Sequence, residues 1–130
     1  MRHLHLGKLL LVVFSLLLAC TVSARKPIKT LLITGQNNHN WQVSHVVLKQ
    51  ILENSGRFDV DFAVSPGQGK DMSGFVLDFT PYQLVVLDYN GDSWPEETNR
   101  RFLEFVQNGG GVVIYHAADN AFSKWPEFNK

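Results

Sequence analysis

Cysteine is almost absent from this sequence. Cys20 is the single cysteine among 130 residues, so no disulfide can form within one chain. Stability must therefore come from a packed core rather than from covalent cross-links. A thiolate nucleophile in the body of the chain is excluded for the same reason, because that chemistry requires a cysteine at the site.

An excess of charge of one sign and the common nucleotide-binding motifs are also lacking. The chain has 12 basic and 12 acidic residues and no basic stripe, which argues against nucleic acid as a partner. No GxGxxG, Walker or GxSxG pattern occurs, so dinucleotide-binding, P-loop and nucleophile-elbow serine enzymes are excluded. The glycine run at 109–111 precedes an apolar run instead of following one, so it indicates a helix-ending turn rather than a phosphate loop.

No apolar run is long enough to cross a membrane. The run at residues 9–19 is interrupted only by Ser15. At about 1.5 Å per residue it cannot cross a hydrocarbon core of about 30 Å. With Arg2 and Lys8 before it, the run is typical of the hydrophobic region of a secretory signal.

Residues 1–24 are therefore predicted to be a signal peptide, and the protein to be exported to the periplasm or the cell exterior. Small residues at Val22, Ser23 and Ala24 favour cleavage after Ala24. A lipoprotein-type box ending in Cys20 is the alternative, and it would leave a lipid anchor on that cysteine. Neither alternative changes the fold that follows.

Short apolar runs alternate with helical patterns after the signal. Strands are predicted at 31–34, 58–64, 84–88 and 112–115. Helices are predicted from Val43 to Asn54 and from about Pro95 to Val106, each ended by a glycine turn. This order predicts an α/β fold with a doubly wound, mainly parallel, flavodoxin-like sheet.

Polar clusters follow three of the predicted strands, at 35–41, 88–92 and 116–120. The carboxyl ends of parallel strands share one edge of the sheet, which is where such sheets bind ligands. We therefore expect one site at this edge. The predicted catalytic residues are His116, His39 and Asp88, and the predicted substrate-binding residues are Asn38, Trp41, Tyr89 and Asp119.

Several roles stay open for these residues. His116 fits a general base, a metal ligand or a strut for its own loop. A divalent metal held by both histidines and one of Asp88, Asp92 or Asp119 is an open alternative, and no cofactor is otherwise indicated. Aromatic side chains in the loops fit stacking on a sugar ring and core packing equally well.

Four segments, 29–35, 38–41, 82–87 and 109–118, resemble the ThuA-like family, which is named for trehalose utilisation. The resemblance runs from about Lys29 to the last residue and implies a class I glutamine amidotransferase-like fold. In amidotransferases of this fold a cysteine occupies the turn after the strand that matches 112–115. His116 stands there in this sequence, so glutamine hydrolysis through a thioester is excluded.

Members of the family are considerably longer, so residues 25–130 are expected to be the front portion of a ThuA-like domain, with a sheet incomplete at its C-terminal end. The resemblance implies an exported protein of trehalose or related disaccharide catabolism. It would act on a sugar by acid–base or metal-assisted chemistry, as an isomerase, lyase or hydrolase. The alternative is a non-catalytic sugar-binding module on the same scaffold. A flavin site is disfavoured because the first loop lacks a Ser/Thr-rich phosphate cradle.

Mass spectrometry of protein recovered outside the cytoplasm checks the predicted signal peptide. We expect a mature chain that starts at Arg25, or one that starts at an acylated Cys20, because these are the two cleavage patterns in the sequence. An exported protein that retains Met1 would contradict the prediction.

Overall fold

The computed structural model describes residues 25–129, so the predicted signal peptide and Cys20 lie outside the described residues. The elements follow the predicted order of strand, helix, strand, strand, helix, strand. They are β1 (Ile28–Thr34), α2 (Trp41–Asn54), β2 (Phe58–Val64), β3 (Leu84–Leu87), α3 (Glu96–Gln107), β4 (Gly111–Ile114) and a short 3-10 helix, η1 (His116–Asn120). Neither α2 nor α3 has the length and apolar character that a membrane crossing demands.

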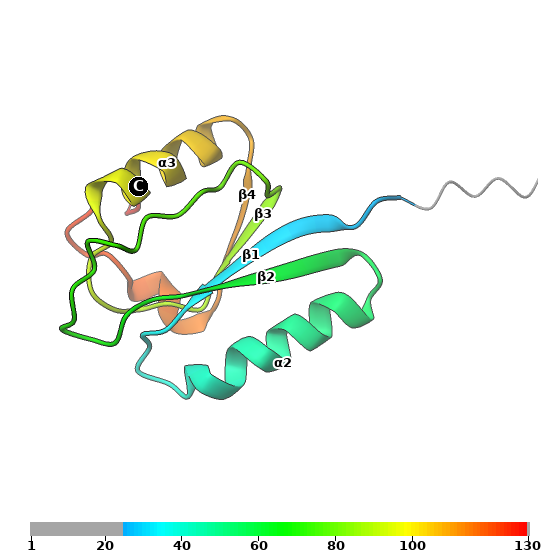
Figure 1. Cartoon of the computed structure of the whole chain (residues 1–130), viewed down its shortest axis with the longest axis horizontal. Coiled ribbons are helices and arrows are strands. Elements are labelled where there is room, and N and C mark those ends of the chain that lie inside the picture. The colour runs from blue at the N-terminus through cyan, green and yellow to red at the C-terminus, as the bar shows by residue number, and fades with distance from the viewer. Residues whose placement is uncertain (1–24, 130) are drawn as a thin grey trace, which may run out of the picture.

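The four strands form one parallel sheet in the order β2-β1-β3-β4. Helices α2 and α3 lie on opposite sides of this sheet (Figure 1). The predicted α/β class is thereby confirmed, and the strand order is that of flavodoxin-like sheets. The centrally placed β1 is buried from Thr30 onward, as expected for a parallel strand covered on both faces.

Alternate residues of the strands point to opposite faces and build two separate cores. On the α2 side, Leu32 packs with Val60 and Val86, with Leu48 and Leu52 of the helix against them. The core on the α3 side is larger and rich in aromatic residues; its buried members include Leu31, Ile33, Phe79, Val85, Leu87, Trp94, Phe102 and Phe122. Truncating a fully buried residue such as Leu32 to alanine is expected to cost about 2–5 kcal/mol of stability.

The boundaries of three elements differ from the sequence prediction. Strand β1 begins at Ile28, three residues early, in a stretch whose polar residues had indicated a lead-in loop. Helix α2 begins at Trp41, which had been placed in the preceding loop. Strand β4 begins at Gly111 because that residue already pairs with Leu84.

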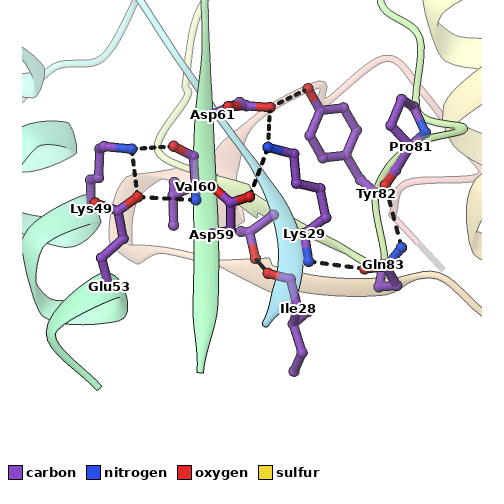
Figure 2. A network of polar contacts seen from close by, with 11 residues as sticks. Ile28, Lys29, Lys49, Glu53, Asp59, Val60, Asp61, Pro81, Tyr82 and Gln83 are labelled. Carbon is purple, nitrogen blue, oxygen red and sulfur yellow. Dashed lines mark hydrogen bonds and ion pairs between the residues drawn. The ribbon is translucent and has the colours of Figure 1, made fainter. Parts of the chain in front are cut away.

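The polar residues of early β1 and β2 belong to one network, shown in Figure 2. The Nζ of Lys29 lies 3.0 Å from a carboxylate oxygen of Asp59 and 3.0 Å from one of Asp61. The hydroxyl of Tyr82 donates to Asp61 at 3.1 Å. The hydrogen bond from Lys29 lowers the pKa of Asp61, and the two aspartates raise the pKa of Lys29. These contacts account for the alternating acidic pattern of β2, although exposed ion pairs contribute little to stability.

The two edges of the sheet differ in what covers them. On β2, the backbone N–H of Val60 donates to Glu53 at 3.2 Å, and its carbonyl accepts from Lys49, so α2 side chains cover that edge (Figure 2). At the other edge, β4 pairs only with β3 among the described residues. Val113 and Ile114 on β4 are 46% and 47% exposed. An uncovered apolar edge of this kind is a template for pairing with another strand.

Expression of residues 25–130 alone tests the β4 edge. We expect this segment to self-associate, and we expect Val113→Lys to reduce the self-association because a charge opposes strand pairing. Light scattering and sedimentation measure the effect. Val64→Lys is the matched control, since Val64 is 50% exposed on the covered β2 edge. A monomeric wild-type segment with a cooperative melt would show that β4 needs no further partner.

Candidate functional site

The polar residues that follow β1, β3 and β4 meet at the carboxyl edge of the sheet. Neighbouring strands β1 and β3 send the chain to opposite faces, because α2 follows β1 and α3 follows β3 (Figure 1). Such a divergence between adjacent parallel strands is where doubly wound sheets bind ligands. The structure therefore places the expected site at a point where the topology favours one.

Asp88 is the most buried of the predicted catalytic residues, at 1% exposure. One of its oxygens accepts from Asn37 Nδ2 at 2.9 Å, and the other accepts from Ser44 Oγ at 2.5 Å. Burial raises the pKa of Asp88, while these two donors act to lower it. Asn37 in turn accepts from the backbone N–H of His39 at 3.0 Å. Asp88 thereby fixes the loop that carries His39.

His39 and His116 form an exposed pair at the same edge. Their ring centroids lie 4.4 Å apart with an angle of 31° between the planes, although 77 positions separate the residues in the chain. His116 has a φ of +49°. Few non-glycine residues adopt this left-handed conformation, and those that do gather at functional sites. The chain therefore turns at His116 through an uncommon backbone conformation.

A buried hydroxyl without a partner lies near Asp88. Thr34 ends β1 and is fully buried, and its Oγ1 has no hydrogen-bond partner among residues 25–129. Thr34 and Asp88 occupy matching places on neighbouring strands, since the N–H of Asp88 donates to the carbonyl of Ile33. Leaving such a group unpaired costs free energy. The α2 face of the site thus holds one polar group that the described residues leave unpaired.

Gln36 ties together the loops around the site. Its side chain donates to the carbonyl of Pro66 at 2.8 Å and accepts from the N–H of Asp92 at 2.7 Å. Its backbone carbonyl also accepts from the N–H of Asn90 at 2.9 Å. A side chain at Gly91 would overlap Gln36, so the two chain segments approach as closely as a glycine allows.

The predicted substrate-binding residues have different surroundings. Asn38 and Asp119 are exposed, and Trp41 is partly exposed with its ring 5.7 Å from that of His45. Tyr89 is 0% exposed, and its ring packs against Trp94 and Phe122. The expectation that Tyr89 stacks on a sugar is therefore corrected: it follows Asp88 directly and points to the opposite face, into the aromatic core.

Sequence reasoning missed three residues that shape the site: Gln36, Asn37 and Ser44. Asn37 and Ser44 hold Asp88, and Gln36 holds the loops. Ser44 lies three residues after Trp41, on the first turn of α2 and on the same side of the helix. Helical spacing could therefore have identified it as a residue next to the site. Nothing local distinguished Asn37 from the other amides of its loop.

The open metal alternative receives no support from the donor set. Within residues 25–129, no three His, Cys, Asp or Glu side chains come close enough together to hold a metal ion. His39 and His116 do meet, but Asp88 is occupied by Asn37 and Ser44, and Asp119 accepts from Asn120 at 2.7 Å.

A comparison with solved structures found a close match. The crystal structure of a protein described as ThuA-like, from Parabacteroides merdae, is 95% identical in sequence to this chain and aligns with a TM-score of 0.79. The match covers 80% of this chain and 37% of that protein, so this chain spans well under half of its length. No protein-family model and no curated protein matches the chain.

The pH dependence of unfolding tests the environment of Asp88. Burial raises the pKa of Asp88 in the folded protein above the ordinary 3.8. At a pH between 3.8 and this raised pKa, the folded protein holds a proton on Asp88 that the unfolded chain has lost. Asp88 therefore lowers the free energy of unfolding as the pH rises through this window. We expect Asp88→Asn to gain thermal stability relative to the wild type as the pH rises from about 4 to about 7. Asp119→Asn, at an exposed carboxylate, is the control, and a difference independent of pH would contradict the assignment.

Proposed function

We propose that this protein, which is similar over 80% of its length to a ThuA-like protein, acts on a sugar by acid–base chemistry at the carboxyl edge of its sheet. The observation that carries the proposal is the pairing of His39 with His116 beside Asp88, which is buried and accepts two hydrogen bonds. The sugar class follows from the family resemblance, and trehalose or a related disaccharide is its first candidate.

The two histidines would perform the proton transfers. Imidazole is the side chain whose ordinary titration falls nearest neutral pH, so a neutral ring takes a proton and a charged ring returns it. Both rings are exposed at the edge and can reach a bound hydroxyl. A pair of rings 4.4 Å apart can serve two neighbouring oxygens of one sugar.

Asp88 fits a positioning role better than the catalytic role first assigned to it. Its carboxylate is buried, which leaves a substrate almost no surface to contact, and each of its oxygens already accepts one hydrogen bond, from Asn37 or Ser44. Through Asn37 it sets the place of His39. Trp41 and Asn38 flank this loop and would contact the sugar ring and its hydroxyls.

A non-catalytic sugar-binding module is the second candidate. Neither the ring of His39 nor that of His116 has a hydrogen-bond partner within residues 25–129. Catalytic bases are usually oriented by a third group, and the described residues do not supply one. This observation favours binding without turnover unless the orienting group comes from elsewhere.

Substitution of His116 in the full-length protein separates the two candidates. His116→Asn keeps a residue that tolerates the left-handed backbone. If the protein is an enzyme, turnover of a panel of neutral disaccharides should fall by about 100-fold or more, with the melting temperature nearly unchanged. Gln50→Asn is the control, because Gln50 is exposed on α2 and contacts neither histidine of the pair. Saturable sugar binding without turnover in the wild type would contradict the enzymatic proposal and support the non-catalytic sugar-binding module.

A further inference from the structure

A hollow lies on the α3 side of the same edge as the candidate site. It has a volume of about 430 Å³ and is lined by residues 90–93, Asn99, Asn120 and 122–125. These come from the loop after β3, from α3, and from the chain around and beyond η1. Its lining does not include His39, Asp88 or His116, so it is distinct from the candidate site.

We propose that this hollow is a subsite for a neutral, hydroxyl-rich ring, namely the second ring of a disaccharide whose first ring lies at His39 and His116. The inference rests on the proposed function for the position of the first ring. The chemical class of the ligand at the hollow follows from the residues that line it.

The charge of the lining excludes a strong preference for an ion. Lys124 and Asp92 are its only charged residues, and their formal charges cancel. The carboxylate of Asp92 already accepts from the N–H of Gly69 at 2.6 Å. The remaining polar groups are amides and hydroxyls, which both donate and accept. Such groups match the hydroxyls of a sugar better than they match a carboxylate or a phosphate.

Asn99 supplies an independent sign that the lining is built for a polar ligand. Its Oδ1 is buried and has no hydrogen-bond partner among the described residues. A buried carbonyl oxygen without a donor destabilises the folded protein, and a bound hydroxyl that it met after a turn of the Asn99 side chain would remove that cost. The usual polarity of exposed loops does not explain an unpaired oxygen at the end of the first turn of α3.

The rim of the hollow is held in place by a strained turn. Phe122 has a φ of +52°, an uncommon value for a bulky residue. Its ring is buried and lies 4.6 Å from the ring of Trp94. This anchor fixes Ser123 and Lys124, which follow it at the rim. Trp125 adds a partly exposed aromatic surface of the kind that packs against the apolar face of a sugar.

The spacing suits one ligand that reaches both places. His116 and Asn120 are the first and last residues of η1, and Asn120 lines the hollow. A 3-10 helix rises about 2 Å per residue, so the two lie about 8 Å apart along η1. Adjacent rings of a disaccharide can occupy two positions at this separation.

Calorimetry on the full-length protein tests the subsite with trehalose, maltose, cellobiose, sucrose and glucose. We expect Asn99→Leu to weaken binding of the preferred disaccharide by about tenfold, the loss of one buried hydrogen bond. Glucose binding should be unchanged, because glucose would occupy the first site. Gln107→Leu is the matched control, an exposed amide on α3 outside the hollow. Lys124→Met, at an exposed position, gives a second test if Asn99→Leu fails to fold.

The outcomes separate the subsite from the proposed function. Disaccharide affinities unchanged in both variants, or no binding of any of the disaccharides, would overturn the subsite. Turnover that depends on His116 but not on Asn99 or Lys124 would retain the enzyme and reject the subsite. Binding that depends on Asn99, in a protein that turns over no sugar, would retain the subsite and reject the enzyme.

Discussion

The parallel pairing of β1 with β3, and of β3 with β4, sets the position of every residue of the candidate site. Because β1 is central, its residues must be covered on both faces, and α2 and α3 supply the two covers. The register then brings the carboxyl ends of β1, β3 and β4 to one edge. The asymmetric cores follow from the same pairing, with an aliphatic layer under α2 and an aromatic layer under α3.

Successive residues of a strand point to opposite faces of the sheet, so neighbouring residues at that edge have different surroundings. Asp88 and Tyr89 are consecutive, yet one joins Ser44 on the α2 side and the other joins the aromatic core on the α3 side. The histidine pair belongs to the first of these environments and the hollow at Asn99 to the second. A ligand that crosses the edge would therefore touch two chemically different surfaces, one suited to proton transfer and one to recognition of hydroxyls.

The element order and the parallel sheet could be predicted from the sequence because apolar runs and glycine turns are local signals. Element boundaries were harder. Lys29 resembles a loop residue until its partners on β2 are known, because its charge is balanced 30 positions away. Within the site, the edge could be predicted but its contacts could not. The bond from Asn37 to Asp88 and the approach of His39 to His116 depend on packing between distant segments.

The close approach of Gly91 to Gln36 has a consequence for how this protein can change over evolution. Any side chain at position 91 would occupy the space of Gln36, and Gln36 is the residue that joins the loops. A side chain at position 91 is thus acceptable only with a compensating loss of volume at position 36. Among relatives the two positions should vary together, and the rare lineages that replace the glycine should also have exchanged the glutamine for a smaller residue and found another way to hold the loops.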